Sequence, residues 1–131
     1  MTERTGGAGD IRFIAATPVL ASLDIGRTVA FYVERLGAVA VHVEQGVYGI
    51  VALGDIHLHF WACDDRRIAE ATGCRVAVGG IDTLYLRCQA AGIVHPNAPL
   101  HDTAWGSREF AVLDGDGNLI TFHQAMPAAS R

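Results

Sequence analysis

The sequence lacks basic clusters and carries a small excess of acidic residues. Its 131 residues include 10 Lys and Arg against 14 Asp and Glu, which gives a net charge of −4. A protein that binds a phosphate backbone needs a basic stripe to neutralise it. We therefore expect no nucleic acid as a partner, and a mildly acidic protein suits a cationic or neutral small molecule instead.

Long hydrophobic runs are also absent. Half of the residues are hydrophobic, yet no run approaches the roughly 20 residues that cross a bilayer. The first residues contain no apolar stretch of the kind that a signal peptide has. These absences predict a cytoplasmic protein that does not bind a membrane.

Cysteine is scarce. The three cysteines, Cys63, Cys74 and Cys88, cannot all pair within one chain, and none of them belongs to a CxxC motif. In apolar surroundings such residues behave as small buried side chains. We predict that they are reduced structural thiols.

The length of the chain fits one domain that buries its own core. Residues 1–10 are polar and rich in Gly and Thr, which predicts a flexible N-terminus, and residues 126–131 form a short tail. The segment 11–125 remains as the single folded domain.

The first half of this domain reads as one strand, one helix and three further strands. Asp24 is a typical helix N-cap, Gly37 is a typical helix stop, and apolar residues recur between them at helical spacing. Val-rich and Ile-rich segments between Gly-containing turns predict the strands. The predicted elements are a strand at 13–20, a helix at 25–36 and strands at 38–43, 47–53 and 56–62.

The second half repeats this order. Its predicted elements are a strand at 74–78, a helix at 82–91, a short strand at 93–94 and a terminal hairpin with strands at 110–113 and 119–122. The repeat indicates two tandem β-α-β-β-β modules, at about 11–63 and 73–125. We predict an α+β fold in which the two modules form a curved, partly open sheet with the helices outside.

The segment 104–120, AWGSREFAVLDGDGNLI, joins a loop tryptophan to the terminal hairpin, whose turn is DGDGN. We interpret this segment as part of a binding pocket. Together with the motifs TPVL, ERLG, GDIHLHF and GIDTLY, it resembles the bleomycin-resistance proteins, which belong to the vicinal-oxygen-chelate (glyoxalase/dioxygenase) superfamily. The resemblance covers residues 16–124.

The resemblance also implies that the metal site of the superfamily is lost. Its metalloenzymes bind a divalent ion with ligands from four strands, and the matching positions here fall near Thr17, His59, Gly73 and Thr121. Only His59 is a good donor, whereas a divalent ion needs three or four N, O or S donors. We expect no metal, no cofactor and no catalytic residue, with copper present only as part of a bound bleomycin-type drug.

Strand alternation at 56–61 places His57, His59 and Trp61 on one face and three apolar residues on the face that covers the helices. We expect the His and Trp face to line the concavity and contact a ligand. Two alternatives stay open. The histidines make ordinary hydrogen bonds within the fold, or His57, His59 and His123 form a metal site of another kind.

Trp105 and Gly106 precede the hairpin in a Pro-rich loop, where an exposed indole needs a covering partner. The resemblance implies that Trp105 stacks on a flat part of the ligand and that Tyr48 supplies an aromatic ring on the opposite wall. In the alternative, Trp105 packs against its own loop or a second subunit. Arg108 and Glu109 are interpreted as a structural ion pair or as charges at a strand edge, with contact to a ligand as the alternative.

These features predict a homodimeric, non-catalytic protein that sequesters a bleomycin-type glycopeptide antibiotic in grooves walled by both subunits. The expected ligand contacts are Tyr48, His57, His59, Trp61, Trp105 and Gly106. The alternatives are a metal-dependent lyase, isomerase or dioxygenase of the same superfamily, and a binding domain for another planar metabolite.

Overall fold

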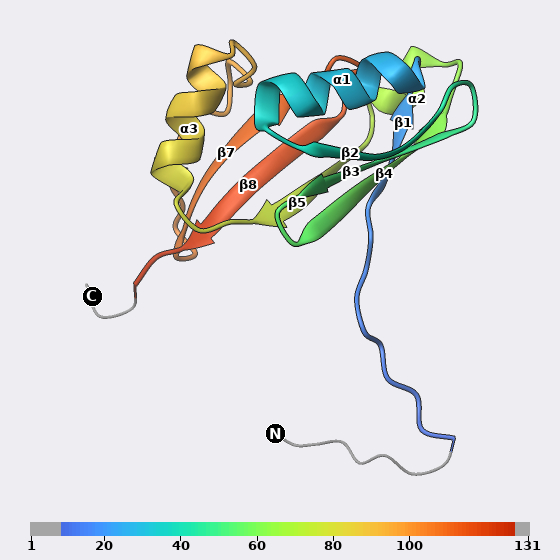
Figure 1. Ribbon diagram of the computed structural model, residues 1–131. Coiled ribbons are helices and arrows are strands. Elements are labelled where there is room, and N and C mark those ends of the chain that lie inside the picture. Colours follow the sequence, from blue (N-terminus) through green and yellow to red (C-terminus); the bar gives the residue numbers. More distant parts are fainter. Residues whose placement is uncertain (1–8, 128–131) are drawn as a thin grey trace.

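Two four-stranded sheets with flanking helices make up the fold (Figure 1). The computed structural model describes residues 9–127. The strand order is β1-β4-β3-β2 in sheet A and β5-β8-β7-β6 in sheet B. The first module consists of β1 (Val19–Ser22), α1 (Ile25–Leu36), β2 (Val39–Glu44), β3 (Tyr48–Leu53), β4 (Ile56–Ala62) and the short α2 (Arg66–Ala69). The second module consists of β5 (Gly73–Ala77), α3 (Ile81–Ala90), β6 (His101–Asp102), β7 (Ser107–Leu113) and β8 (Leu119–Ala125).

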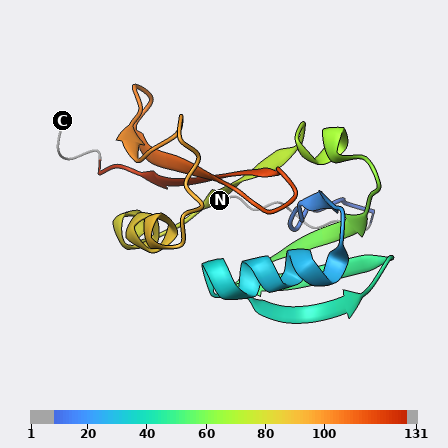
Figure 2. The ribbon, with the colours of Figure 1, turned by 90° about the horizontal axis from the view of Figure 1, so that it is seen from above.

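Both modules have one topology. In each sheet the first strand pairs in parallel with the last, and the remaining pairs are antiparallel. Helix α1 contacts sheet A and α3 contacts sheet B, and Figure 2 shows each helix beside its own sheet. The predicted α+β fold of two repeated modules is confirmed. No helix within residues 9–127 is both long and apolar enough to cross a membrane.

Helix α1 begins and ends at the predicted residues. The Asp24 side chain accepts a hydrogen bond from the backbone N of Arg27 at 3.1 Å, which caps the first turn. Gly37 ends the helix with φ of 73°, a left-handed conformation that favours glycine. The apolar side of the helix, which includes Val29 and Tyr32, is buried against sheet A.

The larger of two clusters of buried apolar residues joins the two modules. Tyr32 from α1 contacts Phe60 from β4 with ring centroids 5.0 Å apart. Phe110 from β7 contacts Tyr85 from α3 at 5.0 Å and Phe122 from β8 at 5.4 Å. Because these side chains belong to one cluster of buried residues, both modules exclude water from the same interior.

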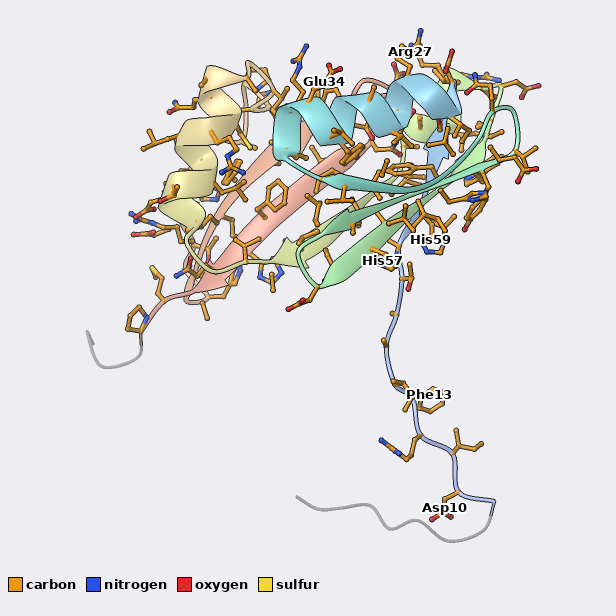
Figure 3. All side chains as sticks on the ribbon, in the orientation of Figure 1. Asp10, Phe13, Arg27, Glu34, His57 and His59 are labelled. Atoms are coloured by element: carbon orange, nitrogen blue, oxygen red, sulfur yellow. The ribbon has the colours of Figure 1, made fainter. Side chains whose placement is uncertain are left out.

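The first predicted strand is wrong in its position. Strand β1 spans Val19–Ser22, whereas residues 9–17 form an extended arm that leaves the body of the molecule (Figures 1 and 3). Ile11, Phe13 and Ile14 are exposed, and Phe13 is 95% exposed. A run of apolar residues indicates a segment that tends to be buried, but it does not indicate whether the burying surface belongs to the same chain. Most of the predicted flexible N-terminus and tail, at 1–8 and 128–131, lies outside the described residues.

Three further elements differ from the sequence-based prediction. The strand expected at 93–94 is reduced to an isolated bridge between Val94 and Val112, and the Pro-rich segment that follows lacks backbone donors for a longer ladder. Strand β6 and helix α2 were not predicted. Helix α2 has only four residues, which is too short for a helical periodicity to be recognised after the Asp65 cap.

The turn at residues 114–118 is a connection between the modules, with its polar side chains buried. Asp114 Oδ2 accepts a hydrogen bond from the Tyr32 hydroxyl at 2.7 Å. Asp116 Oδ2 accepts one from Thr28 Oγ1 at 2.6 Å, and Asn118 Nδ2 donates to the backbone O of Ala21 at 2.8 Å. All three polar residues are buried, so each one depends on its partners in the first module.

The three cysteines are free thiols. Cys63 and Cys88 are buried, and Cys74 is half-buried. Burial raises the pKa of Cys88 to about 11, so its thiol stays protonated at neutral pH. A protonated buried thiol is a poor nucleophile, in keeping with the predicted structural role.

Candidate binding site on the open faces of the sheets

Strand β4 carries the predicted alternation. Leu58 and Phe60 are fully buried in the core, whereas His57 is exposed and Trp61 is 39% exposed. Figure 3 shows His57 and His59 on the side of sheet A that faces away from α1. Ile56, the first residue of the strand, departs from the pattern because it is exposed.

Tyr48 lies on the same face of sheet A as His59 and Trp61. We call this face, which points away from α1, the open face of the sheet. In the strand register Tyr48 is the partner of Trp61, and its hydroxyl shares a hydrogen bond of 2.9 Å with His59 Nδ1. The Tyr48 and His59 rings meet edge to face with centroids 5.5 Å apart. The structure therefore brings four predicted site residues together on one sheet, namely Tyr48, His57, His59 and Trp61.

Trp105 lies in the tight turn between β6 and β7. Its side chain is 74% exposed, and its Nε1 donates a hydrogen bond to Glu109 Oε2 at 3.3 Å. Gly106 follows with φ of 95°, a conformation that a side chain would strain, and its backbone O accepts a hydrogen bond from Met126 N at 2.9 Å. The turn thus presents an indole ring to the surface on a fixed backbone.

Glu109 is the centre of the polar contacts beside this turn. Its Oε2 accepts hydrogen bonds from Arg75 at 2.7 Å and from Ser107 Oγ at 2.6 Å, in addition to the Trp105 indole. Hydrogen bonds from Arg75 and then from Ser107 lower the pKa of Glu109 to about 2, against the opposing effect of desolvation. Glu109 is therefore an ionised acceptor at neutral pH.

Arg108 and Glu109 are both in ion pairs, but not with each other. Successive side chains of a strand point to opposite faces. Arg108 contacts Asp82 at 3.0 Å and Asp102 at 2.8 Å, while Glu109 contacts Arg75. Each of the two charges has an ion-pair partner on another strand, helix or turn.

Tyr48 on sheet A and Trp105 beside sheet B lie at opposite ends of the folded molecule. Tyr48 follows the β2–β3 turn, whereas the Trp105 turn is bonded to the chain end at Met126. Figures 1 and 2 both show the β2–β3 turn far from the C-terminal end. Within one chain, Tyr48 and Trp105 do not form the two walls of a single groove.

The strand register places no metal donor opposite His59 or Thr121. The partner of His59 is Val19, and the partner of Thr121 is Arg75. Neither valine nor arginine is a donor for a divalent ion. Among residues 9–127, no three His, Cys, Asp or Glu side chains gather in a way that could hold a metal.

The alternative set of three histidines is divided between the sheets. His57 and His59 lie on β4 of sheet A, whereas His123 lies on β8 of sheet B, where its strand partners are Ala77 and Glu109. The structure does not bring the three rings into one cluster.

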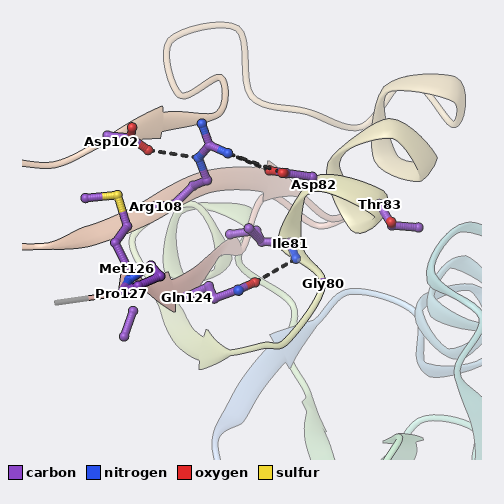
Figure 4. A pocket seen from close by; sticks show the side chains of 10 residues that line it. Gly80, Ile81, Asp82, Thr83, Asp102, Arg108, Gln124, Met126 and Pro127 are labelled. Atoms are coloured by element: carbon purple, nitrogen blue, oxygen red, sulfur yellow. Dashed lines mark hydrogen bonds and ion pairs between the residues drawn. The ribbon is translucent and has the colours of Figure 1, made fainter. Parts of the chain in front are cut away.

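Two surface cavities were not foreseen from the sequence. One of about 510 Å³ lies between the start of α3 and the end of β8, where Arg108 bridges Asp82 and Asp102 and Gln124 accepts a hydrogen bond from Ile81 N (Figure 4). The other, of about 400 Å³, lies between the base of the arm at 15–18, the β3–β4 turn and β5. Both depend on contacts between segments distant in the sequence, which no local pattern reveals.

The arrangement defines a fold class. Two β-α-β-β-β modules, each with its helix beside its own sheet, form a fold that is also found in solved structures of glyoxalase-related proteins. A glyoxalase-related enzyme from Clostridium phytofermentans shares this fold with a TM-score of 0.73 at 20% identity, over 92% of this chain and all of that one.

More similar proteins narrow the class to one family. No family model matches the chain. A bleomycin resistance protein from Geobacillus stearothermophilus is 34% identical over 128 residues, which cover 85% of this chain and 96% of the relative, and one from Staphylococcus aureus gives the same values. The chain therefore belongs to the bleomycin resistance protein family.

Solved structures agree with this assignment. The bleomycin-binding protein from Streptomyces verticillus, complexed with copper(II)-bleomycin, superposes with a TM-score of 0.77 at 28% identity, over 90% of this chain and all of that one. A bleomycin resistance determinant encoded on the transposon Tn5 gives a TM-score of 0.72 at 30% identity, over 86% of this chain and 98% of that one.

Proposed function

We propose that this protein binds and sequesters a bleomycin-type glycopeptide antibiotic without catalysing a reaction. The observation that carries the proposal is the Trp105 indole, which is exposed although its Nε1 donates a hydrogen bond to Glu109. A flat ring held in this way is a stacking surface for a planar ligand. Membership of a family whose solved relatives include a complex with copper(II)-bleomycin supports the choice of ligand.

The proposal includes a homodimer. Tyr48 and Trp105 lie at opposite ends of one chain, so a groove with an aromatic ring on each wall needs one wall from each of two copies. The exposed apolar residues of the arm, Ile11, Phe13 and Ile14, also call for cover by another surface. Each groove would then take one drug molecule, so a dimer would bind two.

Binding alone is proposed as the means of resistance. His59 has Val19 as its strand partner and Thr121 has Arg75, so neither pair offers a set of metal donors. This disfavours the alternative of a metal-dependent lyase, isomerase or dioxygenase. Any copper would arrive with the drug, and the proposal retains the cytoplasmic location expected from the sequence.

Calorimetric titration with metal-free and with copper-loaded bleomycin tests this function. We expect saturable binding of one drug molecule per chain. Absence of heat and of any thermal stabilisation with both forms would reject the antibiotic. Stabilisation by another planar heteroaromatic compound in the same assay would then favour the binding domain for a different metabolite.

A further inference from the structure

Glu109 holds two exposed side chains with one carboxylate. It is only 5% exposed, and its partners are the indole of Trp105, the guanidinium of Arg75 and the hydroxyl of Ser107. Glu109 lies next to Phe110 on β7, but on the opposite face, away from the core. On that face its strand partners are His101 and His123. The Trp105 and Arg75 side chains that it holds are exposed, so a ligand can touch them.

The Trp105 ring has few other restraints. The backbone of its turn is fixed, because Thr103 N donates to Ser107 O at 2.8 Å and Met126 N donates to Gly106 O at 2.9 Å. A ring that is 74% exposed has little packing to hold its own torsions. The bond from Nε1 to Glu109 is the hydrogen bond that ties the side chain to the fold.

Arg75 is held by the same carboxylate. Its NH2 and NH1 groups contact Glu109 at 2.7 and 3.4 Å, and its side chain is 55% exposed. A guanidinium has further N–H donors on its other edges. Arg75 is the strand partner of Thr121 and lines the cavity at the base of the arm, so these donors lie beside the open face of sheet B.

We infer that Glu109 is a positioning residue of the binding site: it fixes the Trp105 indole and the Arg75 guanidinium together, so that the site takes a flat ring system that also carries a hydrogen-bond acceptor. The inference rests on the proposed function through Trp105. The negative charge of the Glu109 carboxylate strengthens each of these hydrogen bonds and narrows the range of orientations that the donor side chains can take. A ring fixed before binding loses less conformational freedom when the ligand arrives.

A role in stability alone is the competing explanation. An ion pair near the surface contributes little to folding, and the Arg75 side chain is 55% exposed even with its partner in place. Removal of the carboxylate therefore leaves no buried charge and opens no core cavity. Variants at this position are expected to fold, which makes the inference testable.

The first experiment needs no ligand. The chain has two tryptophans, so its ¹H–¹⁵N spectrum contains two indole signals, and a Trp105→Phe variant assigns them. In Glu109→Ala we expect the Trp105 indole signal to move toward that of an exposed tryptophan and its ¹⁵N relaxation to show a mobile ring. An unchanged signal and unchanged relaxation would overturn the inference.

The second experiment measures the affinity for metal-free bleomycin. Loss of one charge-assisted hydrogen bond predicts about tenfold weaker binding in Glu109→Ala, with partial recovery in Glu109→Gln, which keeps an acceptor. In the Trp105→Ala background, Glu109→Ala should weaken binding less than in the wild type, because part of its effect passes through the indole. Fully additive losses would contradict a positioning role toward Trp105.

A matched control removes another carboxylate that pairs with arginine. Asp65 contacts Arg67 at 3.0 Å on α2, and Asp65→Asn retains an amide that can cap the helix. We expect no change in affinity or in the Trp105 signal.

The outcomes separate the inference from the proposed function. If wild-type protein fails to bind bleomycin while Glu109→Ala still releases the indole, the proposed function fails and the positioning of Trp105 stands. If the wild type binds and the indole does not respond, only the positioning fails.

Discussion

The two tryptophans differ in what surrounds them. Trp61 is 39% exposed, lies within β4 and has Tyr48 as its strand partner, whereas Trp105 is 74% exposed and lies in a turn. A tryptophan that covers a core contributes to folding through its buried area. Trp105 covers little of the core, so its contribution to stability is expected to be small.

Replacement of Trp105 separates binding from folding. We expect Trp105→Ala to weaken the binding of bleomycin by about 2–4 kcal/mol, the range of aromatic anchors at interfaces, and Trp105→Phe to recover part of it. The free energy of unfolding should change little in either variant. Calorimetry and urea denaturation on the same samples measure both quantities. A lower stability with unchanged affinity would assign Trp105 to packing instead.

The charge state of Glu109 makes a second prediction for this residue. A pKa lowered to about 2 means that its ionised form contributes stability above the ordinary value of 4.5, and that this contribution is lost as the pH falls through about 2. Between pH 8 and 4, the Trp105 indole signal should therefore not titrate. A midpoint near 4.5 would show that Arg75 does not hold Glu109 ionised, and Arg75→Met should move the titration toward that value.

Single residues of the site were predictable where local geometry decides their direction. Strand alternation placed His57, His59 and Trp61 on one face because the period of a strand is fixed by its backbone. The role of Glu109 was not predictable. Its partner Arg75 lies on another strand, 34 residues away, and no pattern in the sequence pairs them.

Elements with signals at both ends were predicted to the residue. Helix α1 spans Ile25–Leu36 as expected, because the Asp24 cap and the Gly37 stop act through local backbone geometry. Strand β1 was misplaced because residues 11–14 have the same apolar character as a buried strand, and only tertiary contacts separate the two. A pattern of apolar residues along a chain predicts the type of element better than it predicts which residues are buried.

The turn of the terminal hairpin shows the same limit. DGDGN was recognised as a turn, but its buried partners on β1 and α1 are 82 to 97 residues away. Asp114 is kept in this interior although burial raises its pKa, because Tyr32 and Asn118 donate to its carboxylate and lower the cost. The turn thus links the modules through polar contacts that need every partner.

Removal of one such partner should lower stability without affecting the site. Tyr32→Phe deletes the hydroxyl that donates to Asp114 at 2.7 Å and leaves the carboxylate buried. We expect a loss of about 1–3 kcal/mol in the free energy of unfolding, measured by urea denaturation. Tyr85→Phe is the matched control, since Tyr85 packs on Phe110 through its ring. Equal stability of the two variants would show that the bond to Asp114 contributes nothing.

At the scale of the whole molecule, the proposed groove needs surfaces from more than one chain. The aromatic groups of one chain lie at opposite ends, and its arm carries apolar side chains into solvent. Sheet A also ends in β2, an edge strand on which Val39, Val41 and Val43 are exposed. Such edges and apolar surfaces are usually covered in a soluble protein. A second copy that covers them would complete the groove at the same time.

Assembly and binding should therefore be lost together when the arm is made polar. We expect the wild-type protein to be a dimer at micromolar concentration by light scattering. Phe13→Ser combined with Ile14→Ser removes two exposed apolar side chains of the arm and should shift the protein toward monomer, with weaker binding of bleomycin. Leu86→Ser, which removes an exposed apolar side chain from α3, is the control and should leave the dimer intact. A wild-type monomer that still binds one drug molecule tightly would reject the shared groove, because a single chain would then supply both walls.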